Sequence, residues 1–407
     1  MRIKVGVIFG GETVEHEVSI ISAIQAMNKI DEEKYEVIPI YITKDREWYT
    51  GDMLKDIEVY KDFSLIKKYS DNVVLYYKDG SYVLQKKHGL FKSIVKELDI
   101  AFPIVHGTNV EDGVLQGYLQ TIGIPYVGPN VYAAVVGQDK AFMKDVWASA
   151  NLPIKNYVWF YDNDYRQDPE EVIKKVSKLK YPVIVKPATT GSSVGINVCD
   201  DESSLKEAID EAVQYDTKIV VEEVVEDLKE VNIAVMGNYE HQKVSEIEEV
   251  LSGNKFLTYT DKYIGGGKTK GKLKTPVKGA SKGMASASRK LPADLDDDVR
   301  KEVERVAKEA FKVLGSSGNS RIDFLIDRKD NKVYLNEINS IPGSLAFYLW
   351  DAKDINFTKV LDDMINIGIK DYKKRVSKTH SFETNILAGF ASNGGLKGAK
   401  GVKGKLR

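Results

Sequence analysis

The stretch NKVYLNEINSIPGS, residues 331–344, places oxygen-bearing side chains inside a β-strand pattern. Residues i and i+2 of a strand share a face, so Glu337 and Asn339 project together. The preceding stretch SRIDFLID, residues 320–327, has a second strand pattern, in which Asp323 lies between two apolar residues. If the two strands pair around the RKDN turn, Asp323 approaches Glu337. The sequence therefore predicts a hairpin with two carboxylates and an amide on one face.

Such a face suits a divalent cation. Two carboxylates and an amide placed together repel one another unless a cation lies between them. Oxygen ligands of this kind suit Mg²⁺, which keeps several waters and shares oxygens with nucleotide phosphates. The alternative is a solvated hairpin face, where the same residue types are common. The hairpin alone leaves both interpretations open.

Two polar segments that follow buried strands indicate a nucleotide. In VIVKPATTGSSVG, Lys186 ends an apolar strand and precedes a glycine loop whose N–H groups can bind phosphate oxygens. The alternative is a plain turn with an exposed lysine. In KIVVEEVV, Glu222 and Glu223 could accept hydrogen bonds from an adenine amino group or ribose hydroxyls. Two common nucleotide motifs are excluded, because GVIFGG lacks the G-x-G-x-x-G spacing and KYIGGGKTKG has Lys262 where a P-loop needs glycine.

The rest of the chain reads as alternating strands and helices. Four parallel strands are expected in the first part, in IKVGVIFGG, YEVIPIYIT, ELDIAFPIVHG and the end of GVLQGYLQTIGIPYVGP. Residues 50–95 interrupt that pattern with NVVLYYKDGSYVLQKK, which predicts a hairpin on an Asp-Gly turn. The segment DDDVRKEVERVAKEAFKVLG predicts an amphipathic helix with Val299, Val303, Val306, Ala310 and Leu314 on its apolar face.

Composition excludes several classes of protein. The net charge of −1 gives no overall field for nucleic acid or membrane surfaces, and no run of 18 apolar residues predicts a membrane span. Cys199 is the single cysteine, so an internal disulfide is impossible and we expect it to serve packing. We expect a cytoplasmic protein with no nucleic-acid or membrane partner.

Six ordered motifs resemble the D-alanine–D-alanine ligases of the ATP-grasp superfamily. They are GGETVEHEVSI (10–20), HGTNVEDGVLQG (106–117), KPATTGSSVG (186–195), TDKYIGG (260–266), SRIDFLI (320–326) and NEINSIPG (336–343). The resemblance implies an α/β ATP-grasp fold with an N-terminal doubly wound (pre-ATP-grasp) domain. The domains expected from it are residues 1–132 with an insertion at about 50–95, 133–221, 222–375 with a lid loop at about 251–290, and a basic flexible tail at 376–407.

The resemblance also implies roles for single residues. Expected to bind ATP are Lys140, Lys186, Ser193, Glu222, Glu223, Val225 and Glu230. Expected to bind two Mg²⁺ ions, or Mn²⁺ in their place, are Asp323, Glu337 and Asn339. Expected to act in catalysis are Glu15, Ser192, Tyr263, Arg321 and Lys262. Expected to bind or position the amino-acid substrates are Glu15, His106, Glu111, Gly343, Ser344 and Tyr348.

The implied chemistry explains these residue types. ATP converts the carboxylate of a first D-alanine to an acyl phosphate, and the amine of a second D-alanine then attacks the acyl carbon. Glu15 is expected to bind the first ammonium and to join Ser192 and Tyr263 in a hydrogen-bonded cluster. Arg321 and the N–H of Gly343 are expected to stabilise the oxyanion, while Lys262 reaches the transferred phosphoryl group.

The chain departs from the family pattern in three places. Glu223 stands where many relatives have lysine, Tyr348 stands where a serine usually reaches the second substrate, and the segments 50–95 and 376–407 have no counterpart in a minimal ligase. Tyr263 favours an amine acceptor over a hydroxyl one. We expect a D-alanine–D-alanine ligase that acts in peptidoglycan synthesis, with a homodimer implied. The alternatives are a ligase with another acceptor, such as D-serine, and a nucleotide-binding protein without catalysis.

Overall fold

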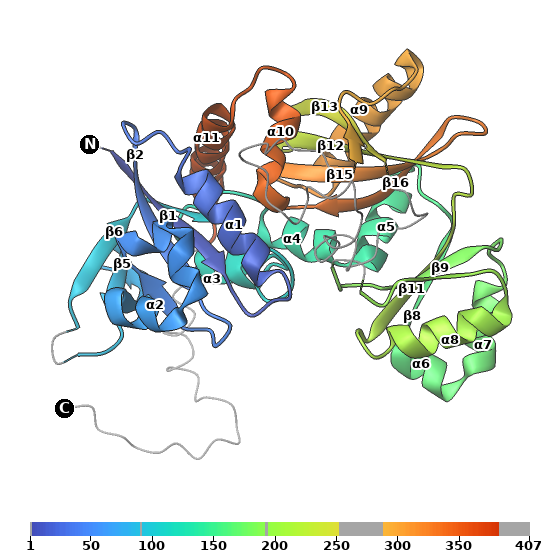
Figure 1. Ribbon diagram of the computed structural model, residues 1–407, viewed down its shortest axis with the longest axis horizontal. Helices are drawn as coiled ribbons and strands as arrows, with labels where there is room; N and C mark the ends of the chain where they lie inside the picture. The colour runs from blue at the N-terminus through green and yellow to red at the C-terminus, as the bar shows by residue number, and fades with distance from the viewer. Residues whose placement is uncertain (1, 90–91, 192–193, 252–287, 382–407) are drawn as a thin grey trace, which may run out of the picture. The chain divides into compact units, whose positions relative to one another are not determined.

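Three β-sheets form the framework of the chain in the computed structural model, which describes residues 2–89, 92–191, 194–251 and 288–381 (Figure 1). The chain divides into two compact units, residues 1–369 and 370–407, and all three sheets belong to the first. The expected lid at 251–290 and tail at 376–407 fall mostly outside the described residues. The boundaries between the expected domains stay a prediction.

The first sheet has the strand order β6-β5-β4-β3-β2-β1-β7. Strand β1 is parallel to β2 and β7, as the apolar runs predicted. The expected fourth parallel strand is reduced, in the described chain, to one bridge between Ala101 and Tyr126. The predicted hairpin is confirmed as β4 and β5, and the segment expected to be an insertion extends this sheet with antiparallel strands. The strands are β1 (Ile3–Gly10), β2 (Tyr35–Ile42), β3 (Trp48–Thr50), β4 (Asp71–Lys78), β5 (Ser81–Lys86), β6 (Ile94–Leu98) and β7 (Ile100–Pro103).

The two outer strands of the first sheet follow one another directly in the chain. Strands β6 and β7 lie at opposite ends of the strand order, yet only Asp99 separates them in the chain. The Asp99 N–H donates to the Lys4 carbonyl at 2.9 Å, and the Lys4 N–H donates to the Asp99 carboxylate at 2.7 Å. A Cβ at Gly6 would lie 2.8 Å from Leu98 Cδ1, so a larger residue there would displace the Leu98 side chain. The helical segments of this part are α1 (His16–Met27), η1 (Asp52–Lys55), η2 (Ile57–Lys61), α2 (Phe63–Tyr69) and α3 (Val114–Ile122).

The second sheet is antiparallel, with the order β10-β9-β11-β8. Alternate apolar residues of β9 and β11, such as Val183, Val185, Ile219 and Val221, form a core with residues of α7 and α8. Because side chains alternate along a strand, Lys186 and Glu222 project from the opposite face. The elements are α4 (Val131–Gln138), α5 (Lys140–Ser149), β8 (Tyr157–Tyr161), α6 (Asp162–Gln167), α7 (Pro169–Val176), β9 (Val183–Pro187), β10 (Asn197–Cys199), α8 (Glu202–Ala212) and β11 (Lys218–Glu223).

The third sheet is also antiparallel, with the order β14-β13-β12-β15-β16, and α9 covers one of its faces (Figure 1). The five apolar positions predicted for the helix at 296–315 all lie in this core, which confirms its orientation. The elements are β12 (Leu228–Gly237), β13 (Gln242–Leu251), β14 (Ser288–Lys290), α9 (Asp297–Val313), β15 (Gly318–Asp327) and β16 (Lys332–Asn339).

The chain after β16 packs back on the first sheet. It forms η4 (Gly343–Ala346), α10 (Phe347–Asp351) and α11 (Phe357–Val376). Leu345, Leu349 and Trp350 belong to the same buried cluster as residues of β1 and β2. Among the helices in the described residues, none is long and apolar enough to cross a membrane.

Candidate functional site

Four polar side chains form a row across the third sheet. Asn232 of β12 pairs with Glu248 of β13 on one side and with Asp323 of β15 on the other. Asp323 in turn pairs with Glu337 of β16, which confirms the pairing expected for the hairpin. We call Glu248, Asn232, Asp323 and Glu337 the polar row. Ile322 and Ile338, which flank it in sequence, belong to the α9 core on the opposite face.

A β-bulge in β16 allows this arrangement. Asp323 pairs with Glu337, but Phe324 pairs with Leu335, so Asn336 is the extra residue. Without the bulge, Leu335 and Glu337 would share a face, because they are two positions apart. With it, Leu335 and Ile338 both reach the core, while Asn336 points to the second sheet and its Oδ1 accepts from Lys186 Nζ at 3.2 Å.

Arg321 and Asn339 surround the carboxylate of Asp323. The Arg321 guanidinium donates to both oxygens, at 2.7 and 2.8 Å, and Asn339 Nδ2 donates to Oδ2 at 3.2 Å. Burial opposes the charge of Arg321, but Asp323 outweighs it and raises the pKa of the guanidinium well above its ordinary value. Asp323, Glu337 and Asn339 thus gather oxygen donors that fit Mg²⁺ beside a permanent cation. This set has two carboxylates and one amide. Among the described residues, no cluster of three or more His, Cys, Asp or Glu side chains is placed to hold a metal ion.

A buried cluster of charges surrounds Glu222, on the face of the second sheet opposite the core with α7 and α8. The Glu222 carboxylate pairs with Lys186 through Oε1 and with Lys144 through Oε2, the latter at 2.6 Å. Burial raises the pKa of Glu222, but the two lysines outweigh it and lower that pKa to about 2. Burial, in contrast, lowers the pKa of Lys144 despite Glu222. Glu222 therefore carries a fixed negative charge that holds the ammonium of Lys186 in place.

Lys140 and the glycine loop after β9 are tied together. Lys140 Nζ donates to the Thr190 carbonyl at 2.9 Å, and Gln138 Nε2 donates to the Thr189 carbonyl at 2.9 Å. Both loop carbonyls therefore face α4 and α5. The next loop residue, Gly191, approaches Glu15, because a Cβ built on it would lie 3.2 Å from Glu15 Oε2. The expected partner Ser192, like Ser193, lies outside the described residues, as do Lys262 and Tyr263.

Glu15 lies at the N-cap of α1, between the glycine loop and Gly107. A Cβ at Gly107 would lie 3.0 Å from Glu15 Oε2 and 2.4 Å from Thr13 Oγ1, and the φ of Gly107 is +82°. Glycine is thus required at 107 for both its conformation and its space. Glu15, in the motif at 10–20, therefore has its carboxylate close to the backbone of the motifs at 106–117 and 186–195.

His106 connects α1 with the loop after β16. Its Nδ1 lies 2.8 Å from the Ile341 carbonyl, so that nitrogen donates, and its Nε2 then accepts from Ser22 Oγ at 3.1 Å. Ser22 Oγ also accepts from the Ser344 N–H at 2.8 Å. Burial lowers the pKa of His106, which agrees with the neutral ring that this pattern requires. His106 therefore orients the loop that carries Gly343 and Ser344.

Glu111 fixes the same loop from the other side. Its carboxylate accepts from the N–H of Gly107 at 3.0 Å, the hydroxyl of Ser340 at 3.0 Å and the N–H of Ile341 at 2.9 Å. Burial raises the pKa of Glu111 to about 7, and nearby Glu15 adds to the increase. The expected role of Glu111, positioning the surroundings of Glu15, fits these contacts.

Three of the residues expected to bind the nucleotide lie near the end of β11 and the start of β12. Glu223 accepts from Asn156 Nδ2 and from the Lys180 N–H, both at 3.1 Å. Val225 is buried, and Glu230 on β12 lies opposite Leu325. Its cationic partner in the described chain is Lys155, at 3.5 Å, whereas Glu222 pairs with Lys186 and Lys144.

Sequence comparison matches almost the whole chain to one family. Residues 4–129 match the family described as D-ala D-ala ligase N-terminus, and residues 146–366 match D-ala D-ala ligase C-terminus. The chain belongs to the D-alanine–D-alanine ligase family. A D-alanine–D-alanine ligase of Thermosipho africanus is 38% identical over 95% of this chain and 98% of its own length. A relative of the same name in Clostridium acetobutylicum is 35% identical over 90% and 98%.

Solved structures support the same conclusion. The D-alanine–D-alanine ligase of Coxiella burnetii has a TM-score of 0.75 and 26% identity, covering 96% of this chain and 98% of that one. The VanG D-Ala:D-Ser ligase of Enterococcus faecalis has a TM-score of 0.73 and 28% identity, covering 90% and 100%. The α/β ATP-grasp fold with an N-terminal doubly wound domain is thereby confirmed.

Within the ligase fold, several residues of the site were missed by sequence reasoning. Lys144 had a signal, because it lies one helical turn after Lys140 on α5. Asn232, Glu248 and Ser22 had none, because only strand register and helix packing bring them to the site. The missed residues are Ser22, Lys144, Asn232, Glu248 and Asn336.

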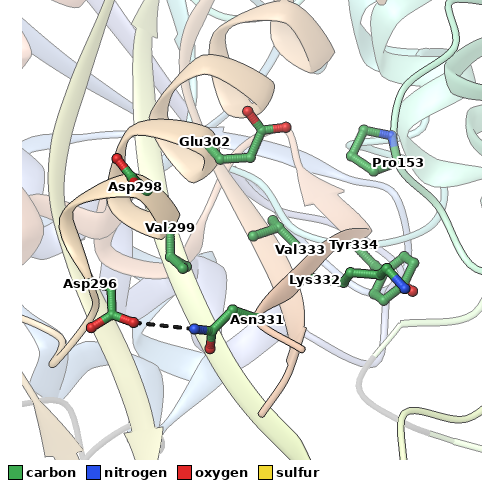
Figure 2. Close-up of a pocket in the computed structure, with 9 residues that line it drawn as sticks. All are labelled: Pro153, Asp296, Asp298, Val299, Glu302, Asn331, Lys332, Val333 and Tyr334. Atoms are coloured by element: carbon green, nitrogen blue, oxygen red, sulfur yellow. Dashed lines mark hydrogen bonds between the residues drawn. The ribbon is translucent and has the colours of Figure 1, made fainter. Parts of the chain in front are cut away.

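A pocket of about 530 Å³ opens elsewhere in the ligase fold (Figure 2). Figure 2 shows Asp296 near the start of α9 bonded to Asn331 in the turn before β16. Val299 and Val333 in its wall belong to the α9 core, which lies on the face opposite the polar row. The pocket is therefore separate from the candidate site. Its lining is Pro153, Asp296, Asp298, Val299, Glu302, Asn331, Lys332, Val333 and Tyr334.

Proposed function

We propose that the protein joins two D-alanine molecules into D-alanyl-D-alanine, with ATP cleaved to ADP and phosphate, to supply peptidoglycan synthesis in the cytoplasm. The observation that carries the proposal is the pairing of Asp323 with Glu337 beside Arg321. The pairing gathers hard oxygen donors for a cation next to a donor for an oxyanion. The Lys186 ammonium, connected to the same hairpin through Asn336, completes a charged site for a nucleotide.

The residues divide the work of the reaction. Lys140 and Lys186 bind the ATP phosphates, and Glu15 binds the ammonium of the first D-alanine. A carboxylate oxygen of this first D-alanine attacks the γ-phosphorus and ADP leaves, which gives an acyl phosphate. Two Mg²⁺ ions held by Asp323, Glu337 and Asn339 would neutralise the phosphate charge when bound.

The second half of the reaction forms the peptide bond. The amine of the second D-alanine, after losing a proton, attacks the acyl carbon, and the carbon–oxygen bond to phosphate breaks. Arg321 and the Gly343 N–H stabilise the negative oxygen that forms in between. Arg321 is suited to this because its charge does not depend on pH. The Ser22, His106 and Glu111 contacts to residues 340–344 fix the position of that N–H.

A ligase with a different acceptor is the second candidate. Tyr348 replaces the usual serine and bonds to buried Glu248, so the acceptor end of the site differs from the family pattern. One structural relative is a D-Ala:D-Ser ligase. A nucleotide-binding protein without catalysis is disfavoured, because Lys186, Asp323, Glu337 and Asn339 are all present and grouped.

An acceptor panel tests the proposal. The purified protein is incubated with ATP, Mg²⁺ and either D-alanine alone or D-alanine mixed with single D- or L-amino acids. Phosphate release and mass spectrometry of the products are measured. D-alanyl-D-alanine from D-alanine alone is the expected result. Products that form only when D-serine or another acceptor is added would favour the second candidate, and no product in any mixture would reject both.

The oligomeric state of the protein can be measured separately from its activity. The family resemblance favours a homodimer of ligase chains. Light scattering of the full chain at several concentrations is expected to give twice the 45.6 kDa chain mass. A constant monomer mass at the concentrations used for the assay would show that activity does not require a dimer.

A further inference from the structure

The hydroxyl of Tyr348 is already engaged inside the protein. It donates to Glu248 Oε1 at 2.7 Å, where Glu248 is buried and Tyr348 is partly buried. Burial, and then the negative charge of Glu248, raise the pKa of this phenol, so it stays protonated and its one O–H donor points to Glu248. A phenol in this position cannot also donate to a substrate carboxylate. Tyr348 therefore does not replace the missing serine directly.

The neighbouring Ser344 is not a replacement through its backbone either. Its N–H donates to Ser22 Oγ, within the network that includes His106. Neither a phenol nor a serine hydroxyl carries a positive charge, so a nearby cation would be the stronger partner for the carboxylate of the second amino acid.

Arg289 lies next to Tyr348. It is on β14, at the opposite edge of the third sheet from β16 and Glu337. Its guanidinium carbon is 5.0 Å from the centre of the Tyr348 ring, and its Nη1 is 3.6 Å from Glu248 Oε2. The second oxygen of Glu248 has no hydrogen-bond partner in the described residues, and it is the oxygen nearest to Arg289 Nη1. The side chain of Arg289 remains 25% exposed, while that of Glu248 is 2% exposed.

Tyr348 also lies between Arg289 and the polar row. Its ring is next to Arg289, and its hydroxyl bonds to Glu248. In the row, Asn232 alone separates Glu248 from Asp323, the partner of Arg321. Arg321 is the proposed oxyanion donor, so the acceptor amine must come close to it. The carboxylate of an amino acid is attached to the same carbon as that amine. A cation beyond the Tyr348 ring is therefore well placed to receive it.

We infer that Arg289 binds the carboxylate of the second amino acid, with Glu248 and the Tyr348 ring as the positioning residues that hold its guanidinium. The inference rests on the proposed ligase function and deepens it. A planar guanidinium has five N–H donors and matches a carboxylate through two parallel bonds. It can therefore keep its contact with Glu248 while it binds substrate.

A competition between two acceptors measures this role without disturbing the donor site. D-alaninamide has the amine of D-alanine but no carboxylate, so it can be an acceptor and not a donor. The full-length protein is given ATP, Mg²⁺, D-alanine and D-alaninamide together. Mass spectrometry then gives the ratio of D-alanyl-D-alanine to D-alanyl-D-alaninamide, which depends only on acceptor choice.

Arg289→Gln is expected to shift this ratio toward the amide by about 10- to 100-fold, the range of one lost charge-assisted contact. The acceptor KM rises, while the KM for ATP is unchanged. Arg289→Lys keeps the charge and is expected to restore much of the wild-type ratio. Arg328→Gln, which removes an exposed arginine between β15 and β16, is the matched control and leaves the ratio unchanged.

Several outcomes would overturn the inference. An unchanged product ratio in Arg289→Gln does so, as does a shift in Tyr348→Phe that exceeds the shift in Arg289→Gln. If Arg289→Gln fails to fold in a thermal melt, the ratio of Arg289→Lys decides, because a shift below about twofold is then required. Failure of the proposed function looks different, since the wild-type protein would then make no dipeptide from D-alanine.

Discussion

Asp323 is bound by a cation in the structure, Arg321, and is proposed to bind a metal ion as well. In the structure, both of its oxygens accept from Arg321, and one also accepts from Asn339. An ionised carboxylate has about four lone-pair positions, so Asp323 could keep its contact with Arg321 and still offer an oxygen to a metal ion. Metal binding would then share this carboxylate with the guanidinium that the second half of the proposed reaction needs.

Replacing Glu337 with glutamine tests the metal site at this scale. The variant keeps the shape of the side chain but removes one charge of the Asp323 and Glu337 pair. Turnover is expected to fall by about 10²-fold or more, with little loss of stability, since Glu337 is only partly buried. Steady-state phosphate release across a Mg²⁺ titration, with a thermal melt alongside, measures both. Near-normal turnover at low Mg²⁺ would reject the assignment.

Lys144 gives a second prediction for single residues. Lys144→Met leaves Glu222 buried with Lys186 as its one remaining cation. The free energy of unfolding is expected to fall by about 2–4 kcal/mol, because a buried carboxylate loses half of its compensation. Urea unfolding measures the change.

The matched control for that variant is Lys206→Met. Lys206 also pairs with a glutamate, Glu202, at 2.7 Å, but both side chains are exposed on α8. Its loss is expected to cost under about 0.5 kcal/mol. Equal losses in the two variants would show that burial of the Glu222 cluster contributes nothing.

Among the elements, β16 and the loop after it carry most of the site. The bulge at Asn336 lets one strand send Leu335 and Ile338 to the core and still present Asn336 and Glu337 to the site. The loop that follows holds Ser344, Leu345 and Ala346 at φ of 51°, 52° and 46°, a region that non-glycine residues seldom adopt. Such strain persists only where the surroundings impose it, and here α1 and Glu111 do so.

Ser22 tests how far α1 controls that loop. Ser22→Ala removes the acceptor for the Ser344 N–H and the donor to His106. Two buried polar groups lose a partner, so kcat is expected to fall by about tenfold, and stability by about 1–3 kcal/mol. Activity assays and urea unfolding check the two effects. Ser149→Ala, an exposed serine on α5, is the control.

The hairpin and its carboxylates were predictable because period-two alternation shows directly which side chains share a face. The bulge was not, because one extra residue in a ladder leaves no mark in the sequence. Glu248 and Asn232 could not be predicted because their place depends on the register of three strands. The segment at 50–95 looked like an interruption, since its strands pair with each other and only through β3 with the predicted sheet. The roles of Lys262, Tyr263, Ser192 and Ser193 stay predictions.

For the whole molecule, the pH dependence of stability reports on one contact between distant parts of the chain. Glu111 joins the loop at 106–113 to Ser340 and Ile341, and burial raises its pKa to about 7 from an ordinary value of 4.5. A raised carboxyl pKa means that the folded state binds the proton more tightly than the unfolded state. Its contribution is therefore complete below about pH 4.5 and is lost as the pH rises through 7.

Glu111→Gln removes that titration. Relative to wild type, the variant is expected to gain up to about 3 kcal/mol between pH 4.5 and pH 8, on top of a constant offset. Urea unfolding at several pH values gives the difference curve. Glu207→Gln, an exposed change on α8, should give a flat difference. A flat curve for Glu111→Gln would mean that the carboxylate is ionised at no cost.

The strand order of the first sheet has a consequence for synthesis on the ribosome. β1 emerges first and gains β2 soon after, but its other neighbour, β7, is made only when residue 103 has been added. Until then a nascent chain carries one side of β1 with open backbone groups, the kind of surface that invites intermolecular pairing. Translation pauses within this stretch would prolong that vulnerable interval, and a chain that stops short of β7 cannot finish its first sheet.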